Sequence, residues 1–394
     1  MTATAQRRMG RDERTLVLGA LLNAMAFFAA LPFAALYLDD RTSLSPAAIG
    51  AVVGAIPLIA ALGGLGGGAL TDRFGAVRLI RLGLALNVAV YCALAATSSP
   101  VGIVALFLLL GAARTLVEPS MKKLLSLVDG GDGRIFRVRY ITLCVGAIVG
   151  PAIGGVLYSL SPAAFFLVPA GFFALYLFLV AVRGGRLARL DAPDPAAGRV
   201  PVGTALRDRR LLAAIGAGGA VFLVFSQMDT VIPLYMRGFL GDRTEYLFAA
   251  LLVTNAVLAL AVQPLVIRWS ERVGPGVLTV AGCVNFAAAF VLFWISPVHV
   301  SLLFAAVVFW TLGEAILLPL PDIAVHTLAS ADRKGTYFGL SELRYLGFFV
   351  GPALGGWLLE AAVPVYFGVM AVAVFPAVVL LARARRARPR FTRR

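Results

Sequence analysis

A small number of ionisable side chains interrupt the long apolar stretches of this chain, and their chemistry stands out. Glu314 lies near the middle of one such stretch with no basic residue close by, and Asp229 interrupts another nearer to its outer end. An ionisable group within a membrane is costly and is therefore a candidate for function. A carboxylate buried away from water favours its neutral form, so it can load a proton on one side of a membrane and release it on the other. We expect Glu314, and after it Asp229, to carry a coupled proton.

Arg114 and Glu118 form a second candidate group for proton coupling. They stand four residues apart and therefore share one face of a helix. Arg114 either neutralises Glu118 in a structural pair, or both residues take part in coupling. Arg344 is a further charge within an apolar stretch, and it either pairs with Glu342 or reaches the loop that contains Asp72. The residue types alone leave these alternatives open.

The composition requires a membrane to position these charges. Of the 394 residues, 60% are hydrophobic and 14% are charged, whereas soluble domains average about 45–50% apolar and about 25% charged residues. A transmembrane helix needs about 20 mostly apolar residues. We assign twelve stretches of this kind: 15–38, 46–70, 77–97, 100–126, 138–160, 162–182, 211–236, 245–267, 275–296, 298–328, 336–360 and 362–382. The sequence therefore predicts an all-α integral membrane protein with twelve transmembrane helices.

The basic residues are distributed unevenly between the predicted loops. With both termini placed in the cytoplasm, most of the 35 Lys and Arg residues fall on inner segments, and the outer loops hold only Arg41, Arg237 and Arg243. Cytoplasmic loops of membrane proteins carry such an excess of positive charge. Anionic lipid accounts for the net charge of +15, and no nucleic-acid partner is needed to explain it. We expect a multi-pass protein of the cell (inner) membrane with cytoplasmic termini.

A polar segment at 183–210 divides the predicted spans into two groups of six. It is rich in arginine and interrupted by proline, which is typical of a cytoplasmic linker. We expect an N-terminal six-helix bundle at 1–182, a C-terminal six-helix bundle at 211–382 and a basic cytoplasmic tail at 383–394.

The two halves share a glycine and proline pattern, which indicates an internal repeat. The fifth and eleventh spans carry it with identical spacing: Gly146, Gly150, Pro151, Gly154 and Gly155 in one, and Gly347, Gly351, Pro352, Gly355 and Gly356 in the other. Small residues four apart let two helix backbones approach closely. Related halves with a site between them are a transporter architecture. The pattern serves either tight packing alone or a pliable seal that bends during alternating access.

The loop after the second span reads Gly68-Ala69-Leu70-Thr71-Asp72-Arg73-Phe74-Gly75. It resembles the signature loop of the major facilitator superfamily, although Ala76 and Val77 stand where that family usually has two basic residues. A degenerate copy begins at Glu271-Arg272 in the second half. The pattern of the fifth span is similar to that of the antiporter branch, in particular bacterial twelve-span drug and metabolite:proton antiporters. The resemblance implies two pseudo-symmetric bundles, and a gating role for Gly68, Asp72, Arg73, Gly75, Glu271 and Arg272.

The same resemblance implies a central cavity lined by spans 1, 4, 7 and 10. The candidates for that lining are Asn23, Phe27, Gln227 and Trp310, together with Asn255 from span 8. Aromatic groups with a few polar ones suit an amphipathic organic molecule, and a carboxylate nearby favours a cationic or neutral ligand. Packing within the bundle is the alternative role for each aromatic side chain.

The leading functional hypothesis is therefore a secondary active transporter that exports a small amphipathic organic molecule by alternating access, in exchange for protons. An importer or facilitator for a nutrient such as a sugar is the alternative within transport, and a membrane receptor or scaffold is a more distant one. The chain carries no zinc-protease motif, no catalytic Ser-His-Asp set and no phosphate-binding Gly-Lys-Ser/Thr loop. We expect no enzyme activity, no metal and no cofactor; the expected partners of a monomer are substrate, protons and membrane lipids, not nucleic acid.

Overall fold

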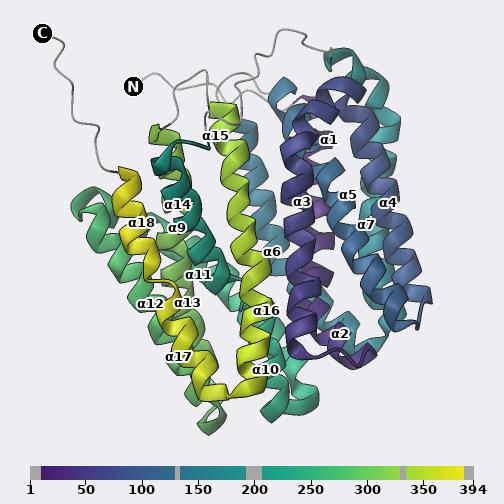
Figure 1. The fold of residues 1–394 in the computed structure, drawn as a ribbon. Coiled ribbons are helices and arrows are strands. Elements are labelled where there is room, and N and C mark those ends of the chain that lie inside the picture. The colour runs from purple at the N-terminus through teal and green to yellow at the C-terminus, as the bar shows by residue number, and fades with distance from the viewer. Residues whose placement is uncertain (1–9, 129–133, 192–205, 329–333, 386–394) are drawn as a thin grey trace, which may run out of the picture. The chain divides into compact units, whose positions relative to one another are not determined.

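The computed structural model describes residues 10–128, 134–191, 206–328 and 334–385, and the side chains at 64–70, 72, 73, 126, 134, 136, 137, 140, 190, 271, 334–336 and 338 lie outside this description. Every regular element within these ranges is a helix (Figure 1). Helices dominate because hydrocarbon offers no hydrogen-bond partner to the backbone, so each span satisfies its own N–H and C=O groups. By contacts the chain forms two compact units.

Unit 1 comprises residues 1–33 and 66–196. Its elements are α1 (Arg11–Ala30), η1 (Leu31–Phe33), the last part of α3 (Pro46–Phe74), α4 (Ala76–Ala96), α5 (Pro100–Val128), α6 (Arg134–Leu160) and α7 (Pro162–Leu190). Helix α1 packs against α6 and α7, and α4 packs against α5 and α7. Proline at the first position starts α5 and α7, where its missing N–H costs nothing.

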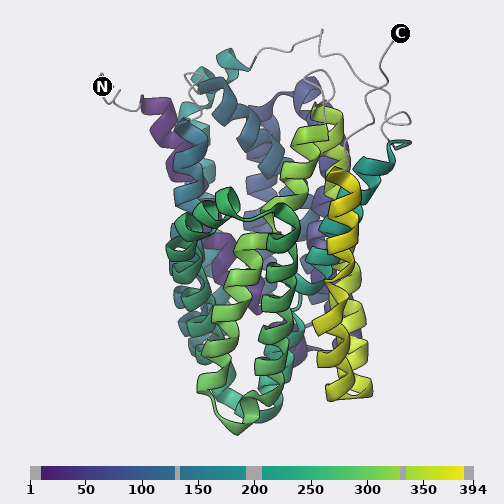
Figure 2. The ribbon, with the colours of Figure 1, turned by 90° about the vertical axis from the view of Figure 1, so that its left-hand side faces the viewer.

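Unit 2 comprises residues 34–65 and 197–394. Its elements are α2 (Ala34–Arg41), the first part of α3, α9 (Arg209–Phe225), α10 (Val231–Leu240), η2 (Gly241–Arg243), α11 (Thr244–Arg272), α12 (Pro275–Ile295), η3 (Ser296–Val298), α13 (Ser301–Leu317), α14 (Pro319–Leu328), α15 (Lys334–Ser341), η4 (Glu342–Arg344), α16 (Tyr345–Ala361), α17 (Val363–Ala373) and α18 (Pro376–Arg385). Helix α9 packs against α16 and α18, and α12 packs against α13 and α17. Both views show α17 and α18 in yellow as one column with a break between them (Figure 2).

The described helices follow the twelve predicted spans. Ten segments of the described chain are long and apolar enough to cross a membrane by length and composition, and one of them, Val231–Ser270, joins α10 to α11. Helices α9 and α16 have 17 residues each. Each belongs to a span that a short break divides. Helix α9 is followed after its break by α10, and α16 is preceded by α15 and the short helix η4. The predicted all-α membrane fold is thereby confirmed, and several spans are interrupted helices.

The repeated glycines lie where two helices of the same unit touch. In unit 1, Gly146 and Gly150 of α6 face Ala24 and Phe28 of α1. A Cβ atom added to Gly146 would lie 2.5 Å from the Cβ of Ala24, and one added to Gly150 would lie 2.6 Å from the Cβ of Phe28. Gly154 faces the backbone at Ala29 in the same way. A side chain on these glycines would overlap its neighbour, so α6 and α1 approach as closely as two backbones can.

Unit 2 repeats this contact between α16 and α9. Gly347 faces the backbone of Gly219, Gly351 faces Leu223 and Ser226, and Gly355 faces the side chain of Gln227. The four-residue spacing is therefore matched on both helices of the pair. The next glycine, Gly356, faces the backbone at Pro46 and Ala47 of α3. The internal repeat read from the sequence corresponds to the same helix contact in each unit.

The predicted division into two bundles remains a prediction. Half of the expected linker, at 192–205, and the end of the expected tail, at 386–394, lie outside the described residues. Helix α7 continues to Leu190, and α9 begins at Arg209. Residues 34–65, which the sequence placed in the N-terminal bundle, group by contacts with unit 2.

Candidate functional site

Asp229 lies at a break in the helix of span 7. Helix α9 ends at Phe225 and α10 begins at Val231, and the turn between them is held by Gln227, whose carbonyl oxygen accepts from the N–H groups of Val231 at 3.1 Å and Ile232 at 3.0 Å. The half-buried Asp229 stands within this turn. Interrupted helices place backbone and polar side chains at the binding sites of many transporters. The sequence predicted the acidic residue but not the break.

Glu314 lies on α13 and is held by a side chain from a different helix. The Nδ2 group of Asn255, on α11, donates to Glu314 Oε2 at 2.9 Å and to Thr311 Oγ1 at 2.9 Å. Thr311 in turn donates to the carbonyl oxygen of Val307 at 2.7 Å, so the hydroxyl that orients the amide is itself fixed. Unit 2 thus contains two half-buried carboxylates, Asp229 and Glu314, and the amide that orients Glu314.

Two predicted cavity residues are buried in the core of unit 2 instead. Trp310 is 0% exposed and lies among aromatic rings, with Phe286 at 4.8 Å and Phe225 at 6.3 Å between ring centroids. Gln227 is also 0% exposed; its Nε2 donates to Leu223 O at 2.8 Å and its Oε1 accepts from Tyr366 at 3.3 Å. Packing covers Trp310 and internal hydrogen bonds occupy Gln227 in this structure, and the assignment of both side chains to a substrate cavity stays a prediction.

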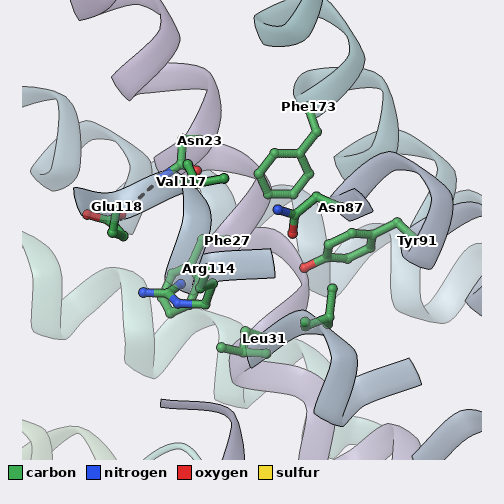
Figure 3. Close-up of a pocket in the computed structure, with 10 residues that line it drawn as sticks. Asn23, Phe27, Leu31, Asn87, Tyr91, Arg114, Val117, Glu118 and Phe173 are labelled. Carbon is green, nitrogen blue, oxygen red and sulfur yellow. Dashed lines mark hydrogen bonds between the residues drawn. The ribbon is translucent and has the colours of Figure 1, made fainter. Parts of the chain in front are cut away.

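A pocket inside unit 1 contains the other predicted side chains (Figure 3). It is lined by Asn23, Phe27, Leu31, Asn87, Tyr91, Leu110, Arg114, Val117, Glu118 and Phe173. These residues come from α1, α4, α5 and α7, with Leu31 from η1. Polar and aromatic groups are mixed around it, with Asn87 beside Phe173 and Tyr91, and Arg114 over Phe27. Asn23, Phe27, Arg114 and Glu118 were predicted as site residues, and all four line this pocket.

The ion pair in this pocket differs from the predicted one. Glu118 pairs with Arg139 of α6 at 2.9 Å, and it accepts from Asn23 Nδ2 at 3.4 Å. The guanidinium of Arg114 instead lies over the ring of Phe27, with its carbon 4.0 Å from the ring centroid. The predicted Arg114–Glu118 pair is therefore replaced by a pair between neighbouring helices. No local pattern signals this exchange, because Arg139 lies 21 positions away from Glu118 on another span.

The predicted gating loop is only partly described. The surroundings of Gly68 and the side chains of Asp72, Arg73 and Glu271 lie outside the described residues, and Arg272 is exposed at the end of α11. Gly75 has φ of 84°, a left-handed conformation that glycine adopts without cost, and it directly precedes α4. A glycine at this turn is thus required by the backbone.

Asp191, which the sequence analysis did not select, occupies the start of α4. Its carboxylate accepts a hydrogen bond from the N–H of Ala76 and forms an ion pair with Lys123 Nζ at 3.0 Å. The Asp191 side chain is 2% exposed. An anion at a helix N-terminus satisfies a free N–H and interacts favourably with the helix dipole. The residue therefore ties the end of α7 to α4 and α5; an acidic residue directly after a long helix was the only available signal.

We expect replacement of Asp191 to lower the stability of unit 1 in two steps. Asp191→Asn keeps an acceptor for Ala76 but loses the charge opposite Lys123, whereas Asp191→Ala loses both. A lost cap costs about 0.5–2 kcal/mol, and the lost ion pair with Lys123 adds to that cost. Thermal unfolding of the purified protein should rank wild type above Asn and Asn above Ala. Equal melting temperatures for all three would contradict this role.

Arg344 pairs within unit 2. Its Nη1 contacts Asp322 of α14, its Nη2 lies 3.5 Å from Glu342, and its guanidinium carbon lies 5.1 Å from the ring centroid of Phe222. Of the two predicted alternatives, the structure shows the pair with Glu342 and adds Asp322. These contacts surround η4, the short break between α15 and α16.

A cluster of three charges joins three helices of unit 2 and was not predicted. Nη2 of Arg237, on α10, lies 3.1 Å from Asp40 at the end of α2 and 2.8 Å from Glu245 at the start of α11. The Glu245 side chain is 8% exposed. One cation therefore joins α2 to α10 and α11, and so helps attach residues 34–65 to the rest of unit 2.

Replacing Arg237 with Gln should loosen α2. The change removes the cation that Asp40 and Glu245 share, so the two carboxylates repel each other and the attachment weakens. We expect hydrogen exchange of peptides from α2 to accelerate by about tenfold, which corresponds to about 1.4 kcal/mol. The matched control is Arg243→Gln, an exposed residue of η2 with the same loss of charge. Unchanged exchange in the Arg237 variant would show that the cluster contributes nothing to this attachment.

Metal chemistry has no visible support in the described residues. Among them, His, Cys, Asp and Glu side chains form no group of three or more that could hold a metal ion. The polar groups near Glu314 are an amide and a hydroxyl, and those near Glu118 are an amide and arginine. These groups suit hydrogen bonding and proton exchange.

The interrupted apolar helices and the half-buried carboxylates define a multi-pass helical membrane protein of the transporter class. The chain belongs to the Major Facilitator Superfamily, whose sequence profile matches residues 16–345. It is 28% identical over 362 residues to the uncharacterized MFS-type transporter YqjV of Bacillus subtilis (strain 168), covering 89% of this chain and 88% of that one. It is 25% identical to the multidrug resistance protein MdtH of Klebsiella pneumoniae (strain 342), covering 88% and 86% of the two chains. The predicted family is confirmed.

Solved structures agree with this fold. A POT family transporter in complex with a thioalcohol-conjugated peptide has a TM-score of 0.80, with 14% identity, and the match covers 94% of this chain and 96% of that one. The nucleoside transporter NupG has a TM-score of 0.78, with 13% identity, and the match covers 96% and 100% of the two chains. At these identities the likeness shows the shared fold alone.

Proposed function

We propose that this chain is a proton-coupled exporter of small amphipathic organic molecules that works by alternating access. The observation that carries the proposal is the pair of half-buried carboxylates in unit 2, Glu314 and Asp229, with Asn255 donating to Glu314 at 2.9 Å. Membership of the superfamily supports transport of a small molecule. The name of the relative MdtH, a multidrug resistance protein, supports the direction and the kind of substrate.

Each of the two carboxylates is suited to carry a proton. A carboxylate shielded from water favours its neutral form, so it can take up a proton on one side of the membrane and release it on the other. Asn255 fixes the position of Glu314 through its amide N–H, and Thr311 holds that amide in place. Asp229 stands on a helix break, where a small backbone change alters its distance from α13. Proton movement is then coupled to substrate movement, because the proton and the substrate stabilise different conformational states of unit 2.

The glycine contacts of α6 and α16 supply a way for the helices to move. Each is a close contact with little side-chain interdigitation, so α6 and α1, and α16 and α9, can shift against each other. The signature loop around Asp72 and Arg73 is proposed as the inner gate, as is its copy at Glu271 and Arg272. The exporter would act as a monomer in the cell membrane, with both termini in the cytoplasm, two six-helix bundles and membrane lipids around them.

Proteoliposomes with an imposed proton gradient and an internal pH-sensitive dye provide the test. A panel of lipophilic cations, aromatic carboxylates and sugars is added to the wild-type protein and to Glu314→Gln and Asp229→Asn. The proposal expects proton flux that depends on an amphipathic compound and that either variant reduces. Movement of a sugar in the direction of the protons would favour an importer, and movement of substrate without protons would favour a facilitator.

A further inference from the structure

Helices α4 and α7 of unit 1 are joined at the end where α4 begins and α7 finishes (Figure 1). The carboxylate of Asp191, directly after α7, accepts from the N–H of Ala76 at the start of α4. Further along α4, Nη2 of Arg81 donates to two consecutive carbonyl oxygens of α7, Val180 and Ala181, each at 3.2 Å. These two contacts fix the alignment, so the first residues of α4 run antiparallel to the last turns of α7.

The aligned stretch, residues 76–81 and 180–191, is strongly basic. It carries five arginines: Arg78, Arg81, Arg183, Arg186 and Arg189. Within the described part of the chain only Arg186 among them has an ion pair, with Asp12 at 2.8 Å. The single acidic residue of the stretch, Asp191, has a side chain that is 2% exposed and pairs with Lys123. The stretch therefore carries positive charge that its own residues do not neutralise.

Two of these arginines end exposed apolar stripes. On α4, Arg78 is exposed, and Leu82, four residues later and 58% exposed, shares its face. On α7, Phe178 and Val182 are 61% and 63% exposed, and the exposed Arg189 follows seven residues after Val182 on the same face. Large apolar side chains that remain exposed on a spanning helix face hydrocarbon. Each stripe therefore passes from a lipid-facing surface to a cation.

The two stripes lie on the same side of the helix pair. Arg81 points at α7 and Gly184 points at α4, because a Cβ atom on Gly184 would overlap the guanidinium of Arg81. The rotation of about 100° per residue in a helix then turns both stripes to one side. Gly185 lies on that side, is exposed, and has nothing within 4 Å of the position that its Cβ would occupy. The surface of α7 beside Arg189 is thus open to a bound group.

One kind of partner fits both parts of this surface. A phosphate group accepts charge-assisted hydrogen bonds from guanidinium groups, and acyl chains cover exposed apolar side chains. Anionic phospholipid combines the two, and it is attracted to basic residues next to a spanning segment. An acidic soluble protein or free phosphate would meet the arginines but would leave the apolar stripes uncovered.

We infer that the joined ends of α4 and α7 bind one anionic phospholipid, with its phosphate between Arg78 and Arg189 over Gly185 and its acyl chains along Leu82 and Val182. Arg81 holds the two helices together beside the bound headgroup. The site goes beyond the proposed transport and does not depend on it, because it lies wholly within unit 1. It also differs from the lipid around any spanning helix, since it selects a headgroup by charge.

Native mass spectrometry of the full-length protein, delipidated in detergent, tests this inference. The protein is mixed with equal amounts of dioleoyl phosphatidylglycerol, which is anionic, and dioleoyl phosphatidylcholine, which has the same chains and a phosphate but no net charge. The test variant combines Arg78→Gln with Arg189→Gln. The matched control combines Arg243→Gln with Arg268→Gln, which removes two positive charges from exposed positions of unit 2.

We expect the wild type and the control to prefer phosphatidylglycerol, and the test variant to bind it at least about tenfold more weakly, because each arginine near an anionic headgroup adds to the affinity. Phosphatidylcholine binding should be equal in all three proteins. Phosphatidylglycerol should also raise the melting temperature of the wild type more than that of the test variant.

Equal binding of the two lipids to the wild type would overturn the inference, as would an equal loss of phosphatidylglycerol binding in the test variant and the control. Displacement of the lipid by inorganic phosphate at the same concentration would also overturn it, because the site would then bind the free anion.

Discussion

Glu314→Gln is expected to abolish proton-driven transport and to leave exchange of substrate across the membrane in place. Glutamine keeps an oxygen that can accept from Asn255 Nδ2, which lies 2.9 Å from Glu314 Oε2 in the wild type, so the packing of α11 and α13 is preserved. It cannot take up or release a proton, so a proton gradient no longer does work on the substrate. Uphill transport in liposomes should fall to the level of protein-free liposomes, while substrate exchange without a gradient should continue.

The comparison with other carboxylates makes this result specific. Glu13→Gln removes one carboxylate at the start of α1, where the side chain accepts from the N–H of Gly10 at 2.8 Å, and it should transport as wild type. Asp229→Asn should reduce coupling, because it removes the second half-buried carboxylate of unit 2. Retention of full uphill transport by Glu314→Gln would reduce Glu314 to a ligand or a structural group. Loss of exchange together with uphill transport would point to a damaged fold instead.

The fold could be predicted from the sequence because the signals for it are redundant. Span length, the excess of inner positive charge and the two matching glycine patterns all indicate the same architecture, and the confirmed family agrees with it. The glycines at 146 and 150, and at 347 and 351, contact equivalent helices in the two units. Helix breaks were harder to predict, because the turn at Asp229 has no proline or glycine between Ser226 and Thr230 to mark it.

The site could be predicted only in part, because its partners come from distant spans. The cost of a charge within a membrane selected Glu314, Asp229, Arg114 and Glu118. Nothing local indicated that Asn255 would bind Glu314, or that Arg139 would replace Arg114 as the partner of Glu118. The surroundings of Trp310 were hard to predict for a related reason. An apolar span offers an aromatic residue either a cavity or the core, and which face of α13 meets α12 depends on the packing of both helices.

A methyl group added at Gly351 is expected to impair transport more severely than any substitution at a glycine with open surroundings. The new Cβ in Gly351→Ala would lie 2.6 Å from Ser226 Oγ and would overlap the backbone oxygen of Leu223. Backbone atoms cannot turn aside as a side chain can, so α16 must move away from α9; overpacking of this kind costs about 1–3 kcal/mol. Thermal unfolding and the initial rate of transport should both decline. Gly368→Ala, with nothing within 4 Å, is the matched control in unit 2.

The equivalent glycine in unit 1 separates packing from motion. Gly150→Ala places its Cβ 2.6 Å from the Cβ of Phe28 and 2.8 Å from the backbone carbonyl carbon of the same residue, so Phe28→Gly in the double variant removes the side-chain overlap but not the backbone one. If the contact between α6 and α1 serves packing alone, the double variant should regain part of its stability and a matching part of its transport. If the contact between α6 and α1 also bends during transport, the double variant should regain stability, but its transport rate should differ from that of the wild type. The reason is that the flexible glycine now lies on α1 instead of α6. Gly171→Ala, on α7 with no neighbour within 4 Å, should change neither property; if it lowers transport as much as Gly150→Ala does, the close contact between α6 and α1 is not what the glycines provide.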